Sequence, residues 1–108
     1  MMTTTVQKQV LIRARALIAD PDHWTRNVLA RNVAGHSVHW CDPSATKWCA
    51  VDAIYRSTYA LVGSNTRIGK EVAKGIAPIW FGRSLVTMND MRGHAAVVAR
   101  FNRALAAA

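Results

Sequence analysis

Residues 42–62 read DPSATKWCAVDAIYRSTYALV, and this stretch decides the fold that the sequence predicts. Asp42 and Pro43 are residue types that cap a helix and occupy its first turn, so we expect a helix from about Ser44 to Leu61. Apolar residues occur around most of its circumference. Because a helix that is apolar on nearly every side is normally buried, we expect this one to be the central element of the protein.

Three further segments have the apolar spacing of an amphipathic helix. Residues three and four apart form an apolar stripe in each, which predicts helices over about Thr5–Ala19, Thr66–Ala77 and His94–Ala106. Asp20 and Pro21 end the first of them, because the residue before a proline disfavours the helical conformation. Each stripe provides a face that can pack against the central helix.

The segment between the first helix and the central helix predicts a small β-hairpin. Val28–Asn32 and Ser37–Trp40 flank a turn in which Gly35 can adopt a positive φ. Later in the chain, Ser84–Met88 fits either the end of a short helix or an extended piece, and Asn89–Gly93 reads as a loop. The predicted fold class is α+β, mainly α: about four helices around a central buried helix, with one small β-hairpin, in a single domain.

Composition and charge narrow the classes of function. The 108 residues include 14 Lys plus Arg against 6 Asp plus Glu, a net charge of +8, and 18 alanines that favour closely packed helices. No run approaches the roughly 18–20 apolar residues of a membrane span, so we expect a cytoplasmic protein with free thiols and no membrane partner. A basic surface attracts nucleic acid and acidic proteins, and these are the partner classes that we expect.

Four short motifs carry a resemblance to a known family. They are Trp24-Thr25, Ala30-Arg31-Asn32, Trp48-Cys49-Ala50 and Asn89-Asp90. Over about residues 5–105 the chain resembles a family of small bacterial and phage proteins of unknown function. It departs from that family at Asp52, where Gly is usual, and at His94, where Thr is usual. The resemblance implies a phage or mobile-element context and an intact fold, and it implies no activity.

Cys49 is the candidate nucleophile. Near the start of a helix, backbone N–H groups can lower the pKa of a thiol. With His39 as a base, oriented by Asn89 or Asp90, the result would be the arrangement of a cysteine hydrolase. However, apolar residues flank Cys49, and a buried cysteine usually serves as a small hydrophobic residue. Core packing is therefore the favoured interpretation, and a catalytic role the alternative.

The same region contains the residue types of a metal site. His39, Cys41 and Cys49, with His36 nearby, are soft ligands within fourteen residues, and such ligands can hold Zn²⁺ tetrahedrally. Their spacing matches no standard zinc module, and the paired C-x-x-C motif is absent from the sequence. We therefore expect neither a metal ion nor another cofactor.

A basic face is the candidate binding site. Arg67, Lys70 and Lys74 occur at helical steps of three and four, and Arg83 could extend them. Trp80 is a candidate anchor for a partner, because Trp is favoured at binding hot spots. Such cations can contact phosphates, but a run of charges usually just faces water. No recognition helix or RNA-binding motif is visible, so any contact with nucleic acid is expected to involve its backbone.

Polar residues within apolar surroundings form a last group of candidates. Asn89 and Asp90 can cap a helix or form an Asx turn, or they can line a polar pocket beneath Trp24 and Trp48. Asp52 lies in the most apolar predicted helix, where a carboxylate needs a cationic partner or a hydrogen-bond donor. The candidate partners are Arg31, Arg56 and Arg92.

Three functions fit these patterns. The favoured one is a small basic module that docks onto an acidic partner, either a protein or a nucleic-acid backbone, without catalysis. The second is a cysteine-dependent hydrolase or transferase that uses Cys49. The third is a structural or dimerisation domain, in which a second copy of the chain is the partner and the basic face only keeps the protein in solution.

Overall fold

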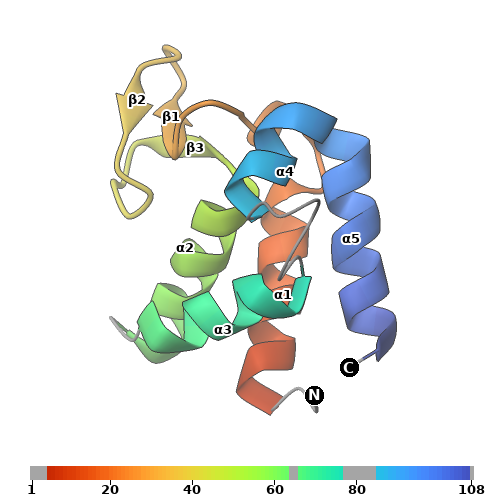
Figure 1. Ribbon diagram of the computed structural model, residues 1–108. Coiled ribbons are helices and arrows are strands. Elements are labelled where there is room, and N and C mark those ends of the chain that lie inside the picture. Colours follow the sequence, from red (N-terminus) through yellow and green to blue (C-terminus); the bar gives the residue numbers. More distant parts are fainter. Residues whose placement is uncertain (1–4, 64–65, 77–84, 108) are drawn as a thin grey trace.

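Five helices and a small antiparallel sheet make up the described part of the chain (Figure 1). The structure, a computed structural model, describes residues 5–63, 66–76 and 85–107. The helices are α1 (Thr5–Ile18), α2 (Ala50–Val62), α3 (Thr66–Ile76), α4 (Leu85–Arg92) and α5 (His94–Ala107), with the 3₁₀ turn η1 at Pro21–His23. The strands are β1 (Ala30–Asn32), β2 (Ser37–Val38) and β3 (Ala45–Trp48). The predicted fold class, α+β and mainly α, is confirmed.

The sheet has the strand order β2-β1-β3, and both pairings are antiparallel. The predicted hairpin is present as β1 and β2, although both strands are shorter than expected. Gly35 has a φ of 85° in its turn, as expected for a residue without a Cβ. Ala30 pairs with Val38 on one side and with Trp48 on the other. Ala30 and Trp48 are both buried, so this row faces the core.

The expected start of the central helix at Ser44 is wrong. The Asp42 carboxylate accepts hydrogen bonds from the backbone N and the Oγ of Ser44, at 2.8 and 2.7 Å, and so forms a turn rather than a helix cap. The next four residues form β3 and pair with β1. The helix begins only at Ala50, with Cys49 as its N-cap. Pairing with a distant strand therefore outweighs the local helix signal.

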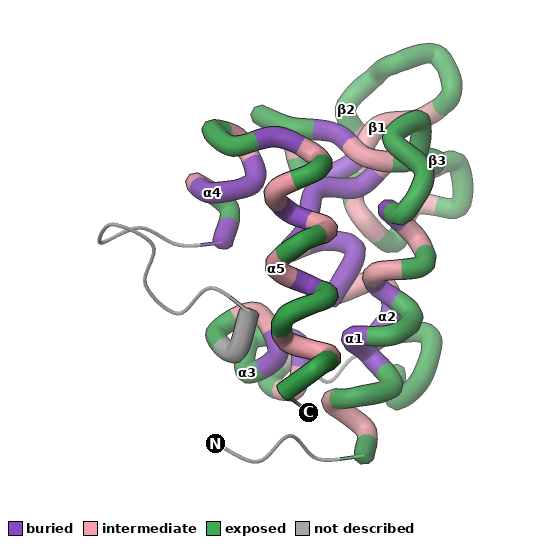
Figure 2. Tube along the Cα trace, turned by 90° about the vertical axis from the view of Figure 1, so that its right-hand side faces the viewer, coloured by how far each residue is buried: buried purple, intermediate pink, exposed green. Residues whose placement is uncertain are grey.

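The core lies between α1, α2 and α5 (Figure 2). Its largest fully buried side chains include Ile18 of α1, Ile54 of α2 and Phe101 of α5. The prediction that α2 is covered on nearly every side is wrong, because Tyr59 is 50% exposed and Leu61 39%. α1 contacts α2, α3 and α5, and it is therefore as central as α2.

The predicted helices of the N-terminal, middle and C-terminal segments correspond to α1, α3 and α5. The expected loop at 89–93 is wrong, because α4 continues to Arg92 and only Gly93, with a φ of 92°, separates it from α5. At the start of α5, His94 Nε2 lies 2.6 Å from the carbonyl oxygen of Ile18, the last residue of α1. The segment 77–84 lies outside the described residues. None of the helices within the described ranges is long and apolar enough to cross a membrane.

Candidate functional site

Asn89 of α4 joins three parts of the chain at a buried junction. Its Oδ1 accepts hydrogen bonds from the indole N–H of Trp24, at 2.7 Å, and from the backbone N–H of Ala50, at 2.9 Å. Its Nδ2 donates to the carbonyl oxygen of Thr25 at 3.1 Å. Because Ala50 is the first residue of α2, Asn89 satisfies one of the N–H groups that a helix leaves unpaired at its start. We call this set the Asn89 junction.

Trp24 and Asn89, two of the residues expected to line a polar pocket, are therefore in contact. The indole N–H and the amide oxygen form a hydrogen bond with each other and do not point into a pocket. Trp24 also forms an isolated β-bridge with Trp48. The Asp90 carboxylate accepts the backbone N–H of Asn27, at 2.9 Å, and Asn27 has a φ of 68°. Arg26 lies over the Trp24 ring, with its guanidinium carbon 5.0 Å from the ring centroid. These contacts fix the loop between η1 and β1 against α4, which is a structural role.

Cys49 is buried at the N-cap of α2. Its Sγ accepts the backbone N–H of Asp52 at 3.5 Å. Burial, with a smaller contribution from the nearby Asp52 carboxylate, raises the pKa of the Cys49 thiol to about 12. The thiolate is the nucleophilic form, so this thiol is unreactive at neutral pH. The N-cap bonds that sequence reasoning expected to lower the pKa are present, but desolvation outweighs them.

His39 is paired with Cys41. Its Nδ1 lies 3.0 Å from the Sγ of Cys41 and accepts the backbone N–H of the same residue at 3.1 Å. Its ring also packs against Trp40, with the ring centroids 4.9 Å apart. No group of three or more His, Cys, Asp or Glu side chains in the described part of the chain is placed to hold a metal ion. Of the candidate metal ligands, the structure brings together only His39 and Cys41 among the described residues, and both are exposed.

Asp52 is a buried carboxylate whose Oδ2 has no hydrogen-bond partner. Burial raises the pKa of this carboxyl to about 6. Arg31 and Arg56, two of the expected partners, instead donate to Thr25 Oγ1 and to the carbonyl of Cys41. In a capping box this carboxylate would accept the N–H of the N-cap residue, but Cys49 N–H already donates to the Leu29 carbonyl.

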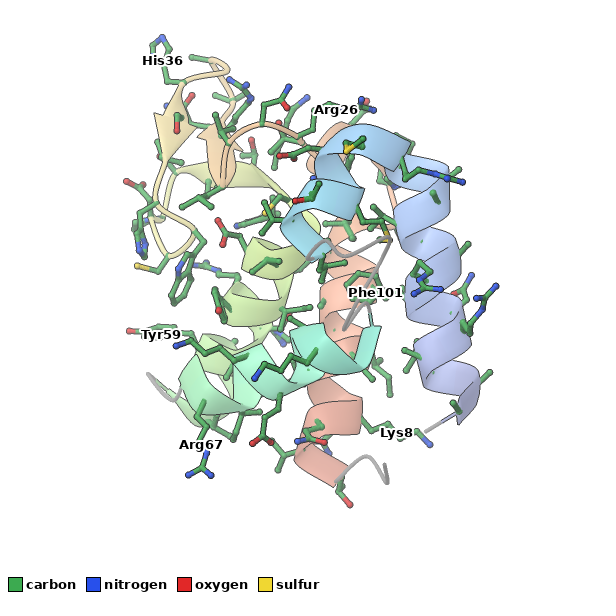
Figure 3. The ribbon with its side chains drawn as sticks, in the orientation of Figure 1. Lys8, Arg26, His36, Tyr59, Arg67 and Phe101 are labelled. Carbon is green, nitrogen blue, oxygen red and sulfur yellow. The ribbon has the colours of Figure 1, made fainter. Side chains whose placement is uncertain are left out.

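The predicted basic face lies on α3, with its cations in solvent. Lys70 and Lys74 are exposed, and Arg67 is 88% exposed and extends away from the body of the protein (Figure 3). Arg67 Nε lies 3.8 Å from the carboxylate of Glu71, which also accepts a hydrogen bond from Gln7 of α1. The face therefore includes a carboxylate that neutralises part of its charge. Trp80 and Arg83 lie outside the described residues.

Sequence reasoning missed a second group of cations on α1 and α5. These helices lie side by side (Figure 1). Arg15 Nε of α1 donates a hydrogen bond to Asn102 Oδ1 of α5. Lys8 and Arg103 are exposed, and the Lys8 side chain points toward the last turn of α5 (Figure 3). We call Lys8, Arg15 and Arg103 the α1–α5 face. Neither helix contains an acidic residue. The sequence shows this directly, because no Asp or Glu occurs before Asp20 or after Asp90.

A shallow pocket of about 500 Å³ lies between α1 and β3. Leu17 and Trp48 provide apolar lining, Arg13 provides a guanidinium group and His23 an imidazole ring. Ala16, Ala45 and Thr46 complete the lining. Sequence reasoning could not predict this pocket, because residues 45–48 were expected to be helical.

One family model matches this chain. It is described as a family of unknown function (DUF6197), and the match covers residues 2–107. No curated protein and no solved structure matches the chain. The expected resemblance to an uncharacterised family is confirmed, and because the match covers almost every residue, the chain belongs to this family of unknown function.

Proposed function

We propose that this protein is a small basic module that docks onto the sugar–phosphate backbone of a nucleic acid and performs no catalysis. The observation that supports this proposal most is that the acidic and the basic side chains differ in their surroundings. Acidic side chains are largely engaged within the protein, whereas most cations face solvent. A positive surface that the protein does not neutralise attracts polyanions and raises their association rate.

The engagement of the carboxylates can be followed residue by residue. Asp42 is bonded to Ser44, and these hydrogen bonds hold the pKa of its carboxyl below the ordinary value. Asp90 accepts a backbone N–H, and Asp52 is buried. Glu71 forms an ion pair with Arg67, which is the one ion pair recorded among the described residues. Apart from the Arg67–Glu71 pair, most cations of the described residues have no recorded ion pair and can contact an anionic partner.

We place the interface on the α1–α5 face. Its cations come from two helices without a carboxylate, whereas Arg67 on α3 is already partnered by Glu71. The face offers no base-reading element, so the contact would be with phosphates and would depend strongly on salt. Such a partner is available in the cytoplasm, and the phage or mobile-element context implied by the resemblance is compatible with this role.

The test is a salt titration of binding to a fluorescein-labelled 20-base-pair duplex, followed by fluorescence anisotropy. We expect binding at low salt, with log K falling linearly against log[salt]. Replacing Lys8, Arg15 and Arg103 with Gln should reduce that slope by about 2.7, since each phosphate contact contributes about 0.9. The matched variant carries Gln at positions 67, 70 and 74, which removes the same charge from α3, and it should keep most of the slope.

Two outcomes contradict the proposal. Absence of binding to duplex DNA and to RNA at 20 mM salt would refute it. Binding to poly-glutamate under conditions where nucleic acid fails to bind would replace it with docking onto an acidic protein. If the α3 variant loses the larger part of the slope, the interface lies on the originally predicted basic face and not on the α1–α5 face.

A further inference from the structure

The register of the sheet places two cations directly opposite each other. Arg31 of β1 pairs with Lys47 of β3 on one side and with Ser37 of β2 on the other. Directly opposed residues of antiparallel strands project from the same face of the sheet. The neighbouring row, through Ala30, faces the core, so this row faces outward. We call it the Ser37–Arg31–Lys47 row.

Opposed like charges destabilise a strand pair unless a counter-charge lies between them. The structure records no ion pair for Arg31 or Lys47 with any described residue. Every Asp and Glu of the sequence lies within the described ranges, so no carboxylate side chain elsewhere could serve.

The guanidinium is also held in place. Arg31 Nε donates to Thr25 Oγ1 at 3.0 Å, and Arg31 Nη1 donates to the Gly35 carbonyl at 2.9 Å. These two bonds restrain the side chain and fix the position of the Arg31 charge on this face of the sheet. They also leave the Nη2 amino group as a donor for a ligand.

This side of the sheet is open to a ligand. Leu29 and Val33, which flank β1, are 49% and 90% exposed. Ser37 at the outer end of the row is exposed, and its hydroxyl is a further donor. The row therefore combines a restrained guanidinium, an ammonium and a hydroxyl on one accessible surface.

We infer that the Ser37–Arg31–Lys47 row is a binding site for a phosphate group. The planar guanidinium of Arg and the ammonium of Lys are donors that proteins use to bind phosphate oxygens. An anion between Arg31 and Lys47 would be attracted to both cations and would offset their mutual repulsion. This site shares no residue with the α1–α5 face, so it goes beyond the proposed function and does not depend on it. It takes a single phosphate, whether free or within a phosphodiester.

The test uses thermal unfolding of the full chain, with phosphate and chloride compared at matched ionic strength. Phosphate should raise the Tm of the wild-type protein, since a ligand that binds only the folded state stabilises it. Replacing Lys47 with Gln should have two opposite effects. It should raise the Tm in chloride by about 1 to 5 °C, because the like-charge pair is gone, and it should abolish the rise in phosphate.

Matched variants separate this site from general charge effects. Lys47→Arg should keep the phosphate response, and Lys70→Gln, which removes an equivalent charge from α3, should leave it unchanged. A second series of measurements replaces phosphate with a dinucleotide, which tests a phosphodiester in place of free phosphate. A rise in Tm that depends on Lys47, with either ligand, supports the site. The inference is overturned if neither ligand raises the Tm of the wild-type protein, or if Lys47→Gln responds as strongly as wild type.

Discussion

Replacing Asp52 with Asn should stabilise the protein at neutral pH. The folded-state pKa of this carboxyl is about 6, against an ordinary value of 3.8, because burial disfavours the charged form. A carboxyl whose pKa is raised by folding favours the folded state below the ordinary pKa and loses that contribution as the pH rises through the folded value. Above about pH 7, wild-type Asp52 is therefore a buried and incompletely paired charge.

The size of the effect follows from the difference between the two pKa values. Each tenfold change in proton affinity is worth about 1.4 kcal/mol, so a difference of about two corresponds to about 3 kcal/mol. Asn removes this penalty but also loses the favourable interaction of a charge with the start of α2, worth about 0.3–1 kcal/mol. We expect a net gain of about 2 kcal/mol at pH 8, which raises the Tm by about 10 °C.

The assay is urea unfolding followed by circular dichroism at intervals from pH 4 to pH 8. The stability difference between Asp52→Asn and wild type should be small at pH 4, grow between pH 4 and 7, and then become constant. Asp22→Asn, an exposed change in η1, is the control and should show no such growth. A difference that is independent of pH, or a variant less stable than wild type at pH 8, would refute the reasoning.

Three further predictions concern the junction, the thiols and one helix contact. Asn89→Ala leaves buried donors unpaired and should destabilise the protein by about 2–4 kcal/mol, measured by thermal unfolding; a loss below 1 kcal/mol would contradict the junction. Iodoacetamide at pH 7.5 should modify Cys41 and spare Cys49 in the folded protein, as read by mass spectrometry. Gly69→Ala would place a Cβ 2.5 Å from the Tyr55 ring and should lower stability by about 1–3 kcal/mol in urea unfolding, with a smaller loss in a Tyr55→Ala background.

The parts of the fold that the sequence predicts well are those whose signal is local. The helices α1, α3 and α5 each bury an apolar stripe that can be read within a window of a dozen residues. The turn of the hairpin is local as well, because Gly35 alone supplies its positive φ. In contrast, β3 depends on pairing with β1, and the Asp42-Pro43 sequence that precedes it suits an Asx turn as well as a helix start.

The candidate site was harder to predict because its contacts join distant positions. Asn89 bonds to Trp24 and Ala50, which are 65 and 39 residues away, so nothing near Asn89 in the sequence distinguishes a loop residue from a junction. The thiol of Cys49 illustrates a different difficulty. Sequence reasoning recognised both the helix start and the burial, but only the structure shows that desolvation outweighs the N-cap hydrogen bonds.

The pairing of the first helix with the last has a consequence for synthesis of the protein. The apolar stripe of α1, which includes Val10 and Ile18, is covered in part by Phe101 of α5, which is translated more than eighty residues later. At 5–20 residues per second, the ribosome needs on the order of ten seconds to bridge that interval. Until then the part of this apolar surface that α5 covers stays exposed on the nascent chain, so we expect a chain that terminates before α5 to be prone to aggregation.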